Sequence, residues 1–146
     1  MKIYLDNCCL QRPLDDKSQS RIQLESEAIL AILTLCEQQK IRLVSSDVLE
    51  FELGKNPHPQ RKAYVTEILA KADIFVQVDL KITQRAKALE GLGFKGADAL
   101  HISCAEAEQV DYFCSCDDKL LKRARALNLL LVKIVSPLEL AEEIVE

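Results

Sequence analysis

Short apolar segments alternate with longer amphipathic ones along this chain, and that order constrains the fold more than any other feature. Apolar segments predict strands at 2–5, 41–45, 74–78, 112–115 and 130–134. Apolar residues at helical spacing predict helices at 20–38, 47–53, 60–71, 80–90, 97–108, 117–127 and 136–143. Short strands that are apolar throughout are typical of a parallel sheet covered on both faces. The sequence therefore predicts an α/β fold, a three-layer α/β/α sandwich around a mostly parallel five-stranded sheet.

Length and charge narrow the class of protein. A chain of 146 residues suits one domain, which we expect to span 1–146. The net charge of −4 argues against a non-specific nucleic-acid binder that relies on a broad basic face. A site for divalent cations must itself concentrate carboxylates, however, so net charge does not exclude phosphodiester chemistry.

The amino terminus and the cysteines bear on the compartment. The first apolar stretch is too short for a signal-peptide core, and no window approaches the roughly 20 apolar residues of a membrane span. We therefore expect a cytoplasmic protein with reduced thiols and no membrane partner. Its six cysteines, at positions 8, 9, 36, 104, 114 and 116, would then not form disulfides.

Acidic residues follow the predicted strands, where parallel sheets usually bind their ligands. They are Asp6 after the first strand, Glu50 and Glu52 after the second, Asp98 in the first turn of a helix, and Asp117 and Asp118 after the fourth strand. Taken alone, each has an ordinary explanation as a helix cap or a surface acid. Together at one edge, they favour a site for a hard cation such as Mg²⁺ or Mn²⁺, which prefers oxygen ligands.

Three motifs resemble those of the PIN-domain ribonucleases, which include the VapC-type toxins of toxin–antitoxin pairs. The motifs are IYLDNCCL near the start, KGADALHISCAE in the middle and FCSCDDKLL toward the end. The stretch SSDVLEFEL supplies the acid after the second strand. The resemblance spans nearly the whole chain, in order and at family-like spacing.

The resemblance implies a fold and a reaction. The strand order would be 3-2-1-4-5. Asp6, Asp98 and Asp117 match the metal-coordinating aspartates, and Glu52 matches the glutamate, with Glu50 as the alternative if the helix register differs. The implied reaction is endonucleolytic cleavage of single-stranded RNA by a water activated on Mg²⁺ or Mn²⁺, leaving 5′-phosphate and 3′-hydroxyl ends. An antitoxin protein and a second copy of the chain are the implied partners.

Residues near these acids have candidate roles in substrate contact. Ser115 resembles the family's Ser or Thr near the last acid, and His101 shares a helical face with Asp98. His101 would either touch substrate or water, or simply pack beside the site. The family often has Asp-Thr-Asn or Asp-Thr-Ser after the first strand; here Asn7 offers a polar contact, but Cys8 replaces a polar side chain. This departure bears on substrate positioning.

Basic and aromatic residues offer further substrate contacts. RNA phosphates would bind near Arg12, Lys55, Arg61, Lys62 and Lys95, unless these are ordinary surface charges. The sequence has no tryptophan, so Phe94 in the glycine-rich loop is the candidate for base stacking.

Three other interpretations remain at this stage. If the first and fourth strands are neighbours, four thiols would meet near the same edge: those of Cys8, Cys9, Cys114 and Cys116. They would then bind Zn²⁺, form a redox pair or simply pack in the core. A phosphoacceptor receiver domain fits poorly, because it needs an acidic pair at the first strand and a lysine after the fifth. A catalytically silent PIN module that binds RNA or protein needs only the fold.

Overall fold

A computed structural model of the chain describes residues 1–128 and 130–144. Within them, one five-stranded sheet has the order β3-β2-β1-β4-β5, and every neighbouring pair is parallel. The strands are β1 (Lys2–Leu5), β2 (Arg42–Ser46), β3 (Ile74–Val76), β4 (Tyr112–Cys114) and β5 (Lys133–Val135). Tyr4 of the central strand pairs with Val44 on one side and Phe113 on the other. The predicted strand order is confirmed.

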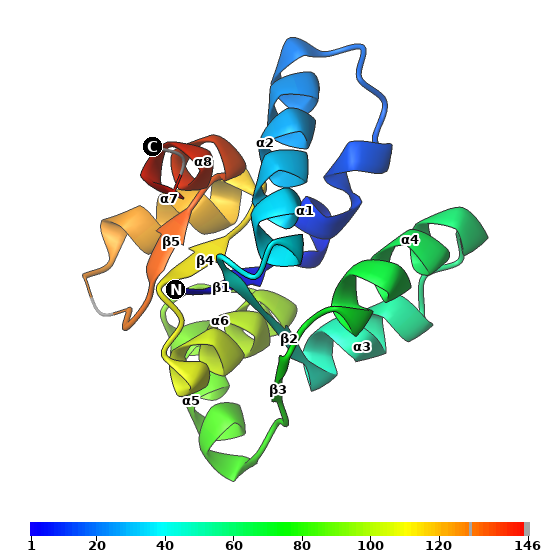
Figure 1. Ribbon diagram of the computed structural model, residues 1–146. Helices are drawn as coiled ribbons and strands as arrows, with labels where there is room; N and C mark the ends of the chain where they lie inside the picture. The colour runs from blue at the N-terminus through cyan, green and yellow to red at the C-terminus, as the bar shows by residue number, and fades with distance from the viewer. Residues whose placement is uncertain (129, 145–146) are drawn as a thin grey trace.

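Helices cover both faces of this sheet, as a three-layer sandwich requires (Figure 1). α2 packs on α8, and α5 packs on α6. The helices are α1 (Asn7–Gln11), the 3₁₀ turn η1 (Arg12–Leu14), α2 (Ser20–Glu37), α3 (Asp47–Gly54), α4 (Pro59–Ala70), α5 (Leu80–Gly91), α6 (Gly96–Glu108), α7 (Asp118–Ala126) and α8 (Pro137–Ile144). The predicted fold class is therefore confirmed. No helix in the described part of the chain is both long enough and apolar enough to cross a membrane.

Side-chain caps start several helices close to the carboxyl ends of the strands. Ser46 ends β2, and its hydroxyl accepts from the Leu49 amide at 3.2 Å, which starts α3 as predicted. Asp117 caps α7 soon after β4 ends. Such caps contribute roughly 1 kcal/mol each. They fix where the chain turns at the edge of the sheet, and so position the side chains that gather there.

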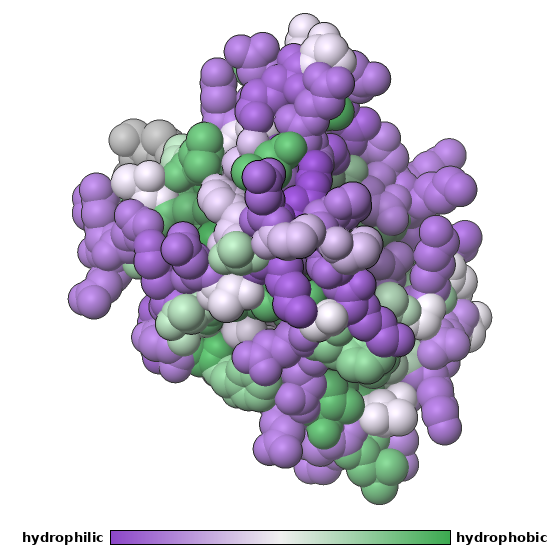
Figure 2. Space-filling model, turned by 90° about the vertical axis from the view of Figure 1, so that its right-hand side faces the viewer, coloured by the Kyte–Doolittle hydropathy of each residue, from purple (hydrophilic) through white to green (hydrophobic). Residues whose placement is uncertain are grey.

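The core is built on the central strand. Ile3, Tyr4 and Leu5 are fully buried, and the Tyr4 ring stacks on Phe113 with centroids 5.3 Å apart. Burying such side chains contributes roughly 1.5–3 kcal/mol each. The face shown in Figure 2 is mostly hydrophilic, with hydrophobic side chains in small groups.

Some predicted boundaries were wrong. The fifth strand begins at Lys133 rather than at 130, because Leu131 is 78% exposed and its amide donates to the Glu106 carboxylate at 2.9 Å instead of to a strand. The third strand ends at Val76 because the Val78 amide donates to Asp47 at 2.7 Å. The helix α1, which holds only five residues, was not predicted.

Candidate active site at the carboxyl edge of the sheet

Asp6 is the most buried of the candidate acids. It directly follows β1, is 8% exposed, and extends the pairing with β4 because its amide donates to the Cys114 carbonyl at 2.9 Å. The Asn7 amide donates to Oδ1 at 2.8 Å, and the Ser115 hydroxyl donates to Oδ2 at 3.0 Å. Burial and the nearby Cys8 raise the pKa of Asp6 well above its ordinary value, against the opposing effect of His101. The carboxyl group is thus fixed in place before any ligand binds.

Ser115 joins two of the acids. Its buried hydroxyl donates to Asp6 and accepts from the Asp117 amide at 3.1 Å. This position agrees with its proposed place beside the last acid. The residue orients the acidic groups through these bonds, and its burial keeps it from touching a large substrate directly.

Asp98 brings a third carboxyl group to the same edge. It lies in the first turn of α6 and is half-buried. Burial, followed by the charges of Asp6 and Asp117, raises its pKa to about 6, partly offset by His101 and Lys95. Asp6 and Asp117 are therefore near enough to Asp98 for their charges to oppose its ionisation.

Asp117 also caps α7, which is the ordinary structural role that its position in the sequence allows. Its Oδ1 accepts from the amides of Lys119 at 2.9 Å and Leu120 at 3.4 Å. The side chain nevertheless lines a cleft of about 420 Å³ together with Asp98. The Asp117 carboxylate therefore both caps α7 and forms part of the cleft lining.

The walls of this cleft are basic. Besides Lys95, a predicted substrate contact, they include Lys119, Lys122 and Arg123 from α7. These three residues were not predicted as substrate contacts, although the basic segment DKLLKRARA begins directly after Asp117 in the sequence. Phe94 also borders the cleft but is only 6% exposed, so its predicted role in stacking on a base is wrong for this conformation.

Glu52 reaches the acidic edge through His101. The His101 Nε2 lies 2.9 Å from Glu52 Oε1 and 3.9 Å from Asp6 Oδ1. Its Nδ1 lies 2.6 Å from the Tyr4 hydroxyl, which in turn lies 2.7 Å from the Ser46 hydroxyl. Burial lowers the pKa of His101, but the bond to Glu52 and the surrounding acids outweigh it and raise the pKa. His101 is 1% exposed, so it orients Glu52 rather than contacting substrate.

Glu50 lies elsewhere. It is exposed and lines a separate hollow with Lys62 of α4. The His101 bond therefore distinguishes Glu52 from Glu50, which the sequence alone left open.

Comparison with known proteins rests on structure alone. No family model matches the sequence, and no curated protein matches it. A chain in the crystal structure of VapBC2 from Rickettsia felis, bound to a DNA fragment from their promoter, superposes with a TM-score of 0.56 at 16% identity. The match covers 93% of this chain and 98% of that one. The fold is PIN-like. The structure thus bears out the fold that the three sequence motifs implied.

Several charged residues that were predicted to lie near the substrate form ion pairs within the protein. Arg12 and Arg61 both pair with Asp15, at 2.9 and 2.8 Å. Asp118 pairs with Arg21 at 2.7 Å. These contacts favour structural roles for Arg12, Arg61 and Asp118.

The remaining predicted contacts are mixed. Lys55 lies over the Phe51 ring at 4.4 Å, which gives it an alternative role in packing on α3. Asn7 is half-buried beside Asp6, and its backbone N–H donates to the Asp6 carboxylate. Cys8 donates its thiol to Asp6 at 3.6 Å, in the position where the family usually has a polar side chain.

The closest gathering of potential metal ligands is made of sulfur rather than oxygen. Among residues 1–128 and 130–144, the only three ligand atoms found within 4.8 Å of one another belong to Cys8, Cys9 and Cys116. Hydrogen bonds from Cys8 and Cys9, aided by Arg12 and opposed by burial, lower the pKa of Cys116 to about 5. The carboxylates share an edge, but their oxygens are spread more widely than these sulfurs.

Proposed function

We propose that this chain is a Mg²⁺- or Mn²⁺-dependent endoribonuclease that cleaves single-stranded RNA. The observation that carries the proposal is the grouping of three acids at one edge of the sheet: the Ser115 hydroxyl donates to Asp6 and accepts from the Asp117 amide, and Asp117 lines one cleft with Asp98. Neighbouring carboxylates repel one another, and a cation between them relieves that repulsion. Asp6, Asp98 and Asp117 would hold the ion, while Glu52 completes the site or orients water.

The donor set fits a hard divalent ion. Mg²⁺ is usually bound by one or two carboxylates and keeps several waters, so three carboxylates need not converge as tightly as thiolates around zinc. When bound, the ion would activate a water and stabilise charge on the phosphodiester. The chain's own contribution is to fix Asp6 through Ser115 and Glu52 through His101.

The basic walls of the cleft support a polyanionic substrate. Lys95, Lys119, Lys122 and Arg123 line the same hollow as Asp98 and Asp117. Lysine and arginine neutralise phosphates along a strand, so a nucleic acid would gain affinity here despite the negative net charge of the protein. We assign RNA rather than DNA from the resemblance of the motifs to PIN-domain ribonucleases.

A role as a toxin follows from the same resemblance. The PIN-like fold and the similarity to a chain of VapBC2 support a toxin of a toxin–antitoxin pair, with an antitoxin protein as partner. Cytoplasmic action and a homodimer are proposed from the sequence and from the resemblance of its motifs alone. Toxicity on expression that a neighbouring gene product relieves would support this role. Expression without growth inhibition would count against it.

RNA cleavage by the purified protein tests the enzyme directly. Labelled single-stranded RNA would be incubated with wild type, Asp98→Asn and Asp118→Asn, each with Mg²⁺, Mn²⁺ or EDTA. We expect metal-dependent cleavage by wild type and Asp118→Asn, because Asp118 pairs with Arg21 outside the acid group. Asp98→Asn should lose cleavage while keeping its circular dichroism spectrum. Undiminished cleavage by Asp98→Asn would refute the assignment.

A catalytically silent PIN-like binding module is the second candidate. The wider spread of carboxylate oxygens than of thiols in the described residues favours it, as does Cys8 beside Asp6. RNA binding without cleavage under any metal condition, combined with no Mg²⁺ or Mn²⁺ binding, would establish this alternative.

A further inference from the structure

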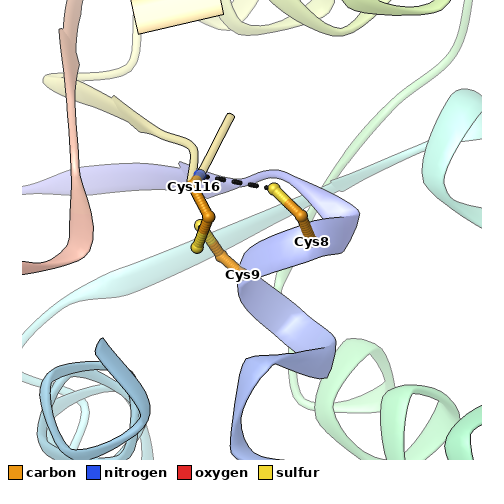
Figure 3. Close-up of side chains that lie close together, drawn as sticks. All are labelled: Cys8, Cys9 and Cys116. Atoms are coloured by element: carbon orange, nitrogen blue, oxygen red, sulfur yellow. Dashed lines mark hydrogen bonds between the residues drawn. The ribbon is translucent and has the colours of Figure 1, made fainter. Parts of the chain in front are cut away.

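Three thiols converge at the start of α1, next to the acidic edge (Figure 3). Cys8 and Cys9 are consecutive on α1, and Cys116 follows β4. They meet because β1 and β4 are neighbours, and the residues that follow these strands emerge side by side. The Cys9 and Cys116 sulfurs are 3.5 Å apart, and the Cys116 amide donates to the Cys8 sulfur at 3.3 Å.

The spacing matches that of sulfurs around one ion. Zn–S bonds of about 2.3 Å in a tetrahedral site place neighbouring sulfurs roughly 3.8 Å apart. The Cys9–Cys116 distance of 3.5 Å is already close to this value, and all three sulfurs lie within 4.8 Å of one another. Small side-chain adjustments would therefore complete a three-sulfur site without moving the backbone.

Ordinary core packing does not account for this arrangement equally well. Cys114 of β4 lies beside the cluster, with its sulfur 3.7 Å from that of Cys9, whereas Cys36 and Cys104 are separate side chains on α2 and α6. In the cluster, by contrast, an amide donates to a sulfur, which is the kind of contact that orients metal-bound thiolates.

We infer that Cys8, Cys9 and Cys116 form a binding site for one thiophilic cation, Zn²⁺, separate from the proposed Mg²⁺ or Mn²⁺ site. Thiolate sulfur selects zinc over hard ions, which prefer the carboxylate oxygens nearby. Cys9 is fully buried and Cys116 is 5% exposed, whereas Cys8 is half-buried. The ion therefore enters on the Cys8 side, and a water completes its tetrahedral coordination there.

The position of this site connects it to the acids. The Cys8 thiol donates to Asp6 Oδ2 at 3.6 Å and lies 3.6 Å from the Ser115 hydroxyl. Zinc binds the three sulfurs as thiolates and releases any protons they carry to solvent. It thereby removes the Cys8 proton that bonds to Asp6 and places a cation beside that carboxyl group. It would therefore inhibit RNA cleavage, a consequence that rests on the proposed function, whereas zinc binding itself does not.

Cobalt is a spectroscopic probe for this site, because thiolate-to-Co²⁺ charge transfer reports sulfur ligands and carboxylate sites give no such band. The reduced full-length chain would be titrated with Co²⁺ and then with Zn²⁺. We expect one Co²⁺ per chain with the sulfur band, displaced by Zn²⁺. Cys116→Ser should weaken binding by at least about tenfold, since even outer-sphere partners typically contribute 10–100-fold. Cys36→Ser is the matched control and should bind normally.

Each outcome of these experiments either supports or overturns the zinc site. Cobalt binding without a sulfur band, or an undiminished band in Cys116→Ser, would overturn the inference. Cys8→Ser provides a second test if Cys116→Ser fails to fold, because Cys8 is the least buried of the three, and an unchanged band in that variant would also overturn it. If wild type cleaves RNA, zinc should inhibit wild type but not a folded Cys116→Ser. If neither cleaves RNA, the cobalt band still decides the zinc site.

Discussion

The Tyr4 hydroxyl is the buried link between the core and the candidate site, so Tyr4→Phe is an informative perturbation. The ring is fully buried, and its hydroxyl lies 2.7 Å from Ser46 Oγ and 2.6 Å from His101 Nδ1. Phenylalanine keeps the stacking on Phe113 and removes only the oxygen. The change in stability therefore reports the hydrogen bonds alone.

The magnitude follows from the two partners. His101 Nδ1 loses its partner in a buried position, which costs about 1–3 kcal/mol. Ser46 Oγ loses one bond, worth about 1 kcal/mol, but still accepts from the Leu49 amide. We expect Tyr4→Phe to lower the free energy of unfolding by about 2–4 kcal/mol. With a urea m-value of about 2 kcal/mol/M, the midpoint would fall by about 1–2 M.

Urea unfolding followed by far-ultraviolet circular dichroism measures this shift. Tyr112→Phe is the matched control, because Tyr112 lies on the neighbouring strand and its hydroxyl donates to Glu143 at 3.1 Å near solvent. That control should change stability by less than about 0.5 kcal/mol. A Tyr4→Phe midpoint that fell no further than that of the control would refute the reasoning and remove the support we assign to His101.

Three further predictions concern the cleft. In metal-free buffer at pH 7, Asp98→Asn should stabilise the fold by about 1 kcal/mol, discounted because the group is half-exposed. Burial and neighbouring charges raise the pKa of Asp98 from 3.8 to about 6, so protonation of Asp98 stabilises the fold at low pH and this stabilisation is lost as pH rises through that range. Wild type should therefore be as stable as Asp98→Asn near pH 3. Urea unfolding of both proteins at pH 3 and pH 7 measures the difference. Gly93→Ala should destabilise the fold by about 1–3 kcal/mol, because Gly93 has a φ of 105° and the new Cβ would lie 2.8 Å from the Arg123 guanidinium carbon. Gly91→Ala is the control and should not destabilise the fold, because the space around Gly91 is open. Thermal unfolding compares the two variants. Lys122→Ala should raise the KM for RNA and flatten its salt dependence with little change in kcat, and an unchanged KM would remove Lys122 from the substrate surface.

The fold was largely predictable because its signals are local and repeated. Short apolar strands and amphipathic helices are each recognisable from the local sequence pattern. The rules for connecting parallel strands then leave few possible sheet topologies. α1 was missed because the five residues 7–11 are too few to show a helical period. The start of the fifth strand was misplaced because Leu131 is apolar yet faces solvent, its amide held by Glu106 from a distant helix.

The acids were predictable from their place after the strands, but the groups that hold them were not. Nothing in the sequence says that Tyr4 reaches His101, because that contact joins residues 97 positions apart. The same holds for the ion pair that removes Asp118 from the acid group. The basic face of α7 was visible in the sequence but was not connected to the cleft until α7 was placed beside Asp98.

The bond between Ser115 and Asp6 joins residues 109 positions apart, and this separation has a consequence for synthesis. A ribosome that adds roughly 5–20 residues per second delivers Ser115 on the order of 5–20 s after Asp6. During that interval β1 lacks β4, and Asp6 lacks the hydroxyl that orients it. A nascent chain therefore passes most of its translation without an assembled acidic edge, and the site comes into being only when the last third of the protein has emerged.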